Sequence, residues 1–263
     1  MRMIFNFFVL ALAFGAAPAV RADARHFGYS TEADSILERG HWEFEQWVTH
    51  RSGRQDGVFR AFDLREELEF GLLERLTTAL YLNFRDLHSE GVTGVTDRDA
   101  MEFKGVSSEW KYMVLSPHLH PLGLLLYFEP TYEGEELELE GKVVLQHNFG
   151  ERWIGVVNAV AEPEWEFDPG GTAKELTLEF TAGLAYQPAP HWSAGIEARS
   201  HTEYVDWGDH EHDAVFVGPS LHWEGGRGWA TLTALPQIPG SGGSRVLDVH
   251  EKVEVRLIGG VLF

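Results

Sequence analysis

The stretch LDVHEKVEVRLIGGVLF, residues 247–263, decides the fold because apolar and polar residues alternate along it. Successive side chains of a β-strand point to opposite faces, so this alternation predicts a strand that separates two different environments. Val253 and Val255 fall on the apolar face, Glu254 falls on the polar face, and only Glu251 interrupts the apolar face. We therefore expect a strand that starts near residue 247 and runs to the C-terminal Phe263.

The same period of two recurs along most of the chain, for example in LELEGKVVL (137–145) and LTLEFTAGLAY (176–186). Strands of soluble proteins average about 5–6 residues, whereas a tilted transmembrane strand needs about 9–11, and most of these stretches are long enough to cross a membrane. An even number of strands is typical of single-chain bacterial barrels. Counting between turn signals predicts about twelve strands, which start near residues 41, 58, 77, 102, 122, 135, 153, 174, 192, 213, 228 and 247.

The connections between these stretches differ in character on the two sides of the predicted barrel. Short turns alternate with connections that are often longer, polar and rich in glycine, as in outer-membrane barrels. Tryptophans fall near both ends of the strands, with Trp153, Trp192 and Trp229 at one rim and Trp165 and Trp207 at the other. The indole ring prefers the membrane–water interface. The expected outer connections are Arg51–Gly57, Asp86–Met101, Glu133–Gly134, Asp168–Ala173, Glu203–His212 and Gln237–Val246.

These features predict an all-β fold, a transmembrane antiparallel up-and-down β-barrel. The alternative is a soluble periplasmic or secreted β-protein, such as a sandwich or a lipocalin-like barrel, in which the apolar faces would form the core. The period alone does not separate the two folds. The strand length, the tryptophans at both rims and the terminal Phe263 favour the membrane.

Residues 1–22, MRMIFNFFVLALAFGAAPAVRA, have the layout of a secretory signal peptide. Arg2 supplies the positive region, an apolar run follows, and small residues before Asp23 form a cleavage site. We therefore expect export, a cleaved signal peptide over residues 1–22, and a barrel domain over residues 23–263. Together with the predicted barrel, this places the protein in the outer membrane of a Gram-negative bacterium.

The composition excludes several classes of protein. The 263 residues include 41 acidic and 21 basic residues, with a net charge of −20 and no cysteine. The negative charge argues against nucleic acid as a partner. The lack of cysteine excludes a disulfide scaffold and a thiol enzyme. The 9 Trp, 17 Phe and 7 Tyr residues are too much aromatic surface for a disordered chain.

Two resemblances support this interpretation. The tail VRLIGGVLF (255–263) resembles the C-terminal β-signal of Gram-negative outer-membrane proteins, which implies insertion by the barrel assembly machinery. A broader resemblance, to an uncharacterised family of bacterial outer-membrane barrels described as transporters or as proteins of unknown function, implies the fold but no catalytic or binding residue. It rests on WEFEQWVTHRSG (42–53), LSPHLHPLGLLLYFEPTY (115–132), LQHNFGERWIGVVNAVAEPEWEF (145–167) and VFVGPSLHW (215–223).

If the apolar faces meet lipid, the charged faces line the lumen. A lumen lined mostly by carboxylates favours cations over anions. The alternative is a closed network of charges that simply fills a narrow barrel, and the sequence also leaves open whether a loop such as Asp86–Met101 folds inward as a plug. The residues expected to line the lumen and bind solute are Glu138, Glu140, Asn158, Glu162, Glu164, Glu166, Glu179 and Arg199.

Two further constellations are candidates for chemistry. His210, His212 and Asp209 combine imidazole and carboxylate ligands that suit a transition metal, although a solvated loop tip would have the same composition. Ser220 and His222 share a strand face, but a hydrolase needs a third, orienting group, and none is evident. We therefore do not expect an enzyme, leaving hydrolysis of a lipid or glycan as a remote alternative.

The sequence thus predicts a channel or facilitator for small hydrophilic solutes that prefers cations, without a cofactor. The expected partners are outer-membrane lipid and lipopolysaccharide, the barrel assembly machinery and the small hydrophilic solute. A non-conducting barrel that binds or scaffolds at the cell surface through its loops is the alternative from another class.

Overall fold

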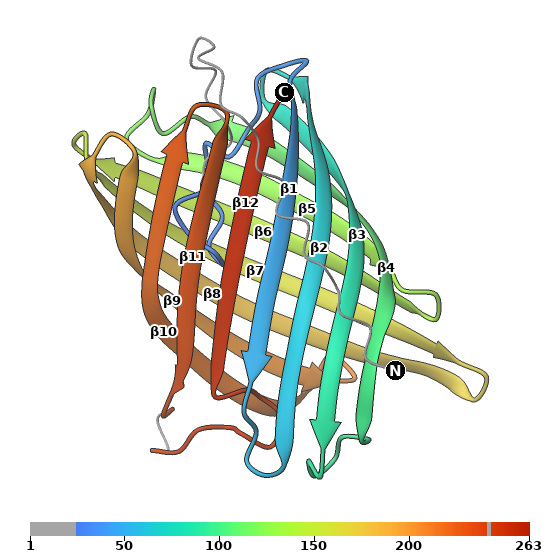
Figure 1. Cartoon of the computed structure of the whole chain (residues 1–263). Coiled ribbons are helices and arrows are strands. Elements are labelled where there is room, and N and C mark those ends of the chain that lie inside the picture. The colour runs from blue at the N-terminus through green and yellow to red at the C-terminus, as the bar shows by residue number, and fades with distance from the viewer. Residues whose placement is uncertain (1–24, 241–242) are drawn as a thin grey trace, which may run out of the picture.

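The computed structural model describes residues 25–240 and 243–263, so the predicted signal peptide, residues 1–22, lies outside the described residues. The strand-forming stretches fold into twelve strands with the up-and-down order expected from the alternation (Figure 1). They are β1 (Trp42–Ser52), β2 (Val58–Leu73), β3 (Leu76–Glu90), β4 (Arg98–Leu115), β5 (Gly123–Tyr132), β6 (Glu136–Phe149), β7 (Trp153–Asp168), β8 (Gly171–Ala189), β9 (Trp192–Val205), β10 (Asp209–Gly225), β11 (Gly228–Ile238) and β12 (Val253–Leu262).

Each strand pairs with its neighbours in the sequence, and β1 pairs with β12 to close the barrel. The closing register sets Glu43 opposite Leu262 and Ser52 opposite Val253. Closure leaves no sheet edge exposed, and an edge inside a bilayer would carry unpaired backbone groups. The described residues include no helix that is long and apolar enough to cross a membrane.

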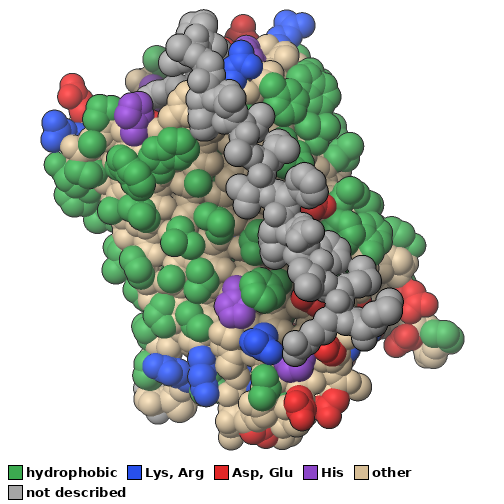
Figure 2. All heavy atoms as spheres, in the orientation of Figure 1, with side chains coloured by type: hydrophobic (Ala, Val, Ile, Leu, Met, Phe, Trp, Pro, Cys, Tyr) green, Lys and Arg blue, Asp and Glu red, His purple; other side chains and the backbone are tan. Residues whose placement is uncertain are grey.

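The outer surface of the barrel carries the apolar side chains, as the alternation predicts. Leu80, Phe180 and Ile196 are each more than half exposed on this face, and Figure 2 shows apolar side chains spread over the wall while charged ones gather toward its ends. Trp153 and Trp192 are exposed at one rim and Trp207 at the other. Trp229 was expected at the first rim, but it is buried inside the barrel, where its indole N–H donates to Glu43.

The two ends of the barrel differ less in loop length than the sequence suggests. We call the end with connections 74–75, 116–122, 150–152, 190–191 and 226–227 the short-turn end, and the opposite end the long-loop end. The expected loop Glu203–His212 is a tight hairpin, because Asp206 and Trp207 adopt positive φ angles of 47° and 61° and let β9 and β10 continue. The expected loop Asp168–Ala173 is also a hairpin, leaving 239–252 as the longest connection.

The last strand begins at Val253 rather than near residue 247, so the prediction was wrong at this boundary. Residues 247–250 form a turn, although their apolar and polar residues alternate. This removes the apparent exception at Glu251, which lies before the strand and pairs with Arg54 at 3.1 Å. From Val253 onward the expected faces hold, with Glu254 fully buried inside and Leu257 exposed outside.

Candidate functional site

The lumen contains the N-terminal segment, residues 25–40, a placement that the alternation of the strands does not predict. Its residues form hydrogen bonds with β3, β6, β7, β9 and β11, which are spaced around the closed barrel. The segment therefore lies inside the barrel, where Figure 1 shows it as a blue loop. The stretch Asp86–Met101, for which the sequence left inward folding open, does not fill the lumen, because its loop 91–97 packs Val92 against Phe59 and Ala61 near the long-loop end.

Side chains of the wall hold the backbone of this segment. The Glu197 carboxylate accepts hydrogen bonds from three successive backbone N–H groups, those of Gly28, Tyr29 and Ser30, with the Tyr29 bond at 2.8 Å. Asn158 accepts from the Thr31 N–H at 2.7 Å and donates to the Thr31 carbonyl at 3.0 Å. Buried backbone groups need such partners, so these wall residues form a binding surface that is specific for the backbone of the segment.

Apolar side chains of the segment fill patches on the inner wall. Phe27 packs against Val156 and Ala185. Gly183 makes room for the ring, since a Cβ there would lie 2.6 Å from a carbon of Phe27. Ala33 packs in the same way against a second apolar patch of the wall. The segment and the inner wall of the barrel therefore share two small hydrophobic clusters.

Buried ion pairs complete the filling of the short-turn half. Lys111 is fully buried and pairs with Glu69 and with Glu109, the latter at 3.1 Å. Arg25, from the N-terminal segment, lies 3.7 Å from Glu45 and 4.7 Å from the centre of the Trp47 ring. Buried charges of this kind are stable only when paired and hydrogen-bonded. This half of the lumen is the closed charge network that the sequence allowed as an alternative.

The other half of the lumen holds a cavity of about 350 Å³. The segment lines it through Arg25 and residues 27–31, and almost all of the remaining lining comes from the strands. Basic side chains gather on one wall, where Arg51, Arg65 and Arg85 lie on β1, β2 and β3, and carboxylates gather on the opposite wall. A solute in the cavity would therefore lie in a transverse electric field.

Five of the eight predicted lumen residues line this cavity, namely Glu138, Glu140, Glu162, Glu179 and Arg199. Asn158 faces the lumen too, but it is buried beneath the N-terminal segment. Glu164 is half-buried nearer the long-loop end, and Glu166 is exposed on the β7–β8 hairpin, which projects beyond the rim (Figure 1). Sequence periodicity gave the face of each residue but not its depth.

The cavity residues differ in how they are paired. Arg199 bonds to Glu179 and to Glu254, the latter at 3.0 Å, and Lys142 pairs with Glu140 at 2.6 Å. Within the described residues no cation lies within ion-pair distance of Glu138 or Glu162. These two carboxylates are therefore the ones that a passing cation could meet without competition from a fixed partner.

Carboxylates also face one another across strands from the cavity toward the long-loop end. Glu138 is opposite Glu164, and Glu136 is opposite Glu166, in the β6–β7 ladder. Directly opposed like charges on one sheet face are destabilising, so these two pairs of carboxylates reduce the stability of the β6–β7 pairing. The row forms an acidic track that leads to the cavity.

The predicted metal site at His210, His212 and Asp209 does not assemble. A β-bulge between His210 and His212 shifts the register of β10 against β9, and this places the two imidazoles on opposite faces of the wall. His210 is half-exposed and pairs with Asp213 at 2.9 Å, and Asp209 is exposed at the start of β10. His212 instead lies beside His201 and His250, which periodicity did not link to it.

Ser220 and His222 are buried at the short-turn end. The Nδ1 atom of His222 lies 2.8 Å from the hydroxyl of Thr231, and that hydroxyl donates to the backbone carbonyl of Arg25. His222 therefore belongs to the wall that holds the N-terminal segment, whereas the Ser220 hydroxyl is buried without a hydrogen-bond partner among the described residues.

Two solved structures have the same fold. The COG4313 outer membrane channel from Pseudomonas putida F1 is 12% identical, with a TM-score of 0.62, covering 87% of this chain and 97% of its own. The NanC porin is 11% identical, with a TM-score of 0.57, covering 84% of this chain and 99% of its own. A comparison with curated proteins gives no match.

The sequence matches the family of unknown function DUF6662 over residues 19–263, and the chain therefore belongs to this family.

Proposed function

We propose that this member of the DUF6662 family is an outer-membrane channel for small hydrophilic solutes. The observation that carries the proposal is the charged cavity of about 350 Å³ inside a closed barrel whose outer wall is apolar. A cavity of this size suits a small molecule, and its charged lining suits a hydrophilic one. The similarity of the fold to an outer membrane channel and to a porin supports the same proposal.

Cations are the preferred solutes in this proposal. The lining as a whole is not acidic, because its eight arginines and lysines outnumber its seven carboxylates. The preference instead rests on Glu138 and Glu162, which have no cation within ion-pair distance among the described residues, and on the acidic track beside them. Unpaired carboxylates in a narrow passage raise the local concentration of cations.

The N-terminal segment acts as an internal gate in this channel. It is seated across the short-turn half through Glu197, Asn158 and Phe27, so a solute in the cavity cannot pass while the segment is in place. We assign the short-turn end to the periplasm, in keeping with other outer-membrane barrels. Lipopolysaccharide would then surround the long-loop end, and the C-terminal Phe263 would guide insertion by the barrel assembly machinery.

Planar-bilayer conductance of the purified full-length barrel tests the channel. We expect cation-selective currents whose cation-to-anion permeability ratio falls in Glu138→Gln/Glu162→Gln, because a unit charge at about 4 Å contributes on the order of 1 kcal/mol, or about fivefold, even in bulk water. Glu151→Gln is the matched control, since Glu151 is exposed in the turn 150–152 and lies neither in the cavity lining nor in the acidic track. An unchanged ratio in the double variant would remove the basis for cation preference.

A substitution at Gly183 tests the gate. Gly183→Val places side-chain atoms where the Phe27 ring lies, so we expect a larger open fraction than in the wild type. Gly141→Ala is the control, because Gly141 has only one backbone oxygen, at 3.9 Å, near a new Cβ. Equal conductance in both variants and the wild type would show that the segment does not limit passage.

A non-conducting barrel is the second candidate, and the filled short-turn half favours it. In that case the barrel would serve only as a support, and its loops would bind or scaffold at the cell surface. Folded protein that gives no current, either as wild type or as Gly183→Val, would support this candidate over the channel.

A further inference from the structure

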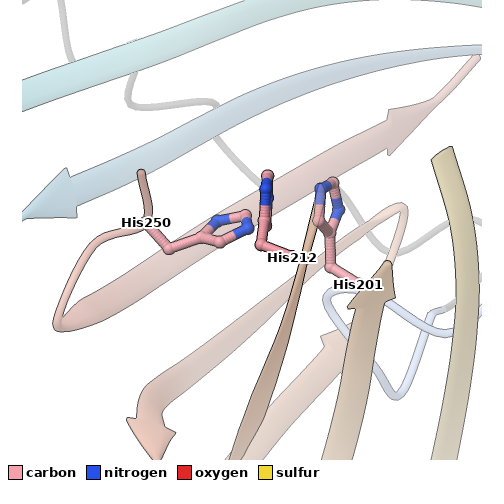
Figure 3. A group of neighbouring side chains, drawn as sticks. All are labelled: His201, His212 and His250. Atoms are coloured by element: carbon pink, nitrogen blue, oxygen red, sulfur yellow. The ribbon is translucent and has the colours of Figure 1, made fainter. Parts of the chain in front are cut away.

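Three histidines from separate parts of the chain meet inside the barrel at the long-loop end. His201 lies on β9, His212 on β10, and His250 in the connection before β12 (Figure 3). Their ring centroids lie 4.6 Å apart for His201 and His250 and 4.7 Å apart for His212 and His250. One ring nitrogen of each lies within 4.8 Å of those of the other two.

The hydrogen bonding of this histidine cluster leaves ring nitrogens available. The Nε2 atom of His250 is buried without a hydrogen-bond partner, and so are both ring nitrogens of His212. An unsatisfied buried polar atom costs free energy. The two nitrogens of His212 have carboxylate oxygens at 3.3 and 3.7 Å without forming hydrogen bonds, so all three atoms are positioned to accept a ligand. His201, by contrast, bonds through Nδ1 to Glu179 at 2.8 Å, which fixes its ring with Nε2 directed toward Glu203, 3.6 Å away.

A carboxylate lies beside the cluster. One oxygen of Glu203 is 3.6 Å from Nε2 of His201 and 3.3 Å from Nε2 of His212. Three imidazoles and one carboxylate form a donor set typical of Zn²⁺ and of other divalent transition metals. The bond from His201 to Glu179 matches the carboxylate–histidine contact that orients metal ligands in known sites.

We propose that His201, His212 and His250, with Glu203 as a fourth ligand, bind a divalent transition-metal ion such as Zn²⁺. Nitrogens of a tetrahedral zinc site are separated by about 3.3 Å, so ring nitrogens that lie within 4.8 Å of one another need to approach by at most about 1.5 Å. Side-chain rotation of this size is available, because His250 lies in a connection and not in a strand. The bound ion would tie this connection to β9 and β10.

Binding of Zn²⁺ to the full-length barrel, purified without a histidine tag in detergent, tests the proposal by calorimetry. We expect one ion per barrel, and at least about tenfold weaker binding in His250→Ala, since loss of even an outer-shell partner costs about 10–100-fold. His210→Ala is the matched control, because His210 lies nearby on β10 but faces the outside. It should bind Zn²⁺ as the wild type does.

Substitution of Co²⁺ provides a second readout, because visible absorption reports its coordination. We expect a tetrahedral spectrum in the wild type and its loss in His250→Ala. Wild-type protein that binds no Zn²⁺ would overturn the proposal. Binding that is unchanged in His250→Ala but lost in His210→Ala would overturn it in favour of the exposed histidine. Neither measurement depends on conductance, so the metal site and the channel fail or stand separately.

Discussion

The two halves of the lumen are built by the same strands and the same alternation, yet one is filled and the other is open. In the short-turn half, Lys111 and its carboxylate partners are fully buried and Phe27 packs against an apolar wall. In the long-loop half, Glu138 and Glu162 line a cavity, and among the described residues neither has a cation within ion-pair distance. The difference lies in what the inner faces carry, because apolar and compactly paired residues accept a packed segment whereas unpaired charges require water.

The largest expected difference between the two halves is in the free energy of unfolding when the buried ammonium group of Lys111 is removed. Lys111→Met leaves Glu69 and Glu109 buried without their ammonium partner. We expect the free energy of unfolding to fall by about 3–5 kcal/mol. Lys104→Met, at the cavity wall, removes a partly exposed ion pair with Glu133 and should cost less than about 1 kcal/mol.

Urea unfolding of the detergent-solubilised barrel, followed by tryptophan fluorescence and by mobility of unheated protein on a gel, measures both variants. Equal losses of stability in Lys111→Met and Lys104→Met would show that the two halves are not energetically different.

A smaller change loosens the N-terminal segment while leaving the wall intact. Glu197→Gln removes the charge that accepts three backbone N–H groups, and a hydrogen bond to a charged group contributes about 1.5–3 kcal/mol. We expect faster hydrogen exchange at the amides of residues 28–30, measured by mass spectrometry. Glu175→Gln, at an exposed carboxylate of β8, should leave these amides protected. Unchanged exchange in Glu197→Gln would mean that the carboxylate does not hold the segment.

The smallest expected effect concerns the exposed long-loop end. The hydroxyl and backbone N–H of Thr93 donate to Asp56 at 2.6 and 3.0 Å and lower the pKa of Asp56. A carboxyl whose pKa is lowered on folding stabilises the fold above its unfolded pKa of about 3.9, and this contribution is lost as the pH falls through the folded pKa.

Thr93→Val removes the hydroxyl donor and should move the pKa of Asp56 back toward its usual value. A carbon-13 NMR titration of the Asp56 carboxyl measures this change. A pKa in Thr93→Val that equals the wild-type value would show that the hydroxyl bond seen here does not form in solution.

Periodicity predicted the barrel wall well because it reports only which face a side chain occupies. It placed Glu138, Glu162 and Arg199 inside, and they line the cavity. It missed the N-terminal segment, although LGLLLYF (122–128) and WIGVVNAV (153–160) carry apolar residues on both faces. An apolar inner face in a barrel needs an apolar partner, and Leu125 and Val156 meet the segment there. That signal was available in the sequence, but it does not identify the partner.

The metal prediction failed for a related reason. Strict alternation would place His210 and His212 on one face, and a single bulge in β10 separates them. A bulge depends on hairpin geometry and not on a residue pattern, so period two cannot locate it. His201 and His250 join His212 only through strand pairing and through the path of the connection before β12.

The sequence by itself determined the number of strands, their order and the face of most side chains, because these follow from local alternation and turn residues. The tertiary structure decided what occupies the lumen, which carboxylates lack a cation and which histidines meet. Those properties arise when closure of the barrel brings residues such as Tyr29 and Glu197, or His201 and His250, into contact. Such contacts depend on register and depth along the barrel axis, and a pattern along the chain carries neither.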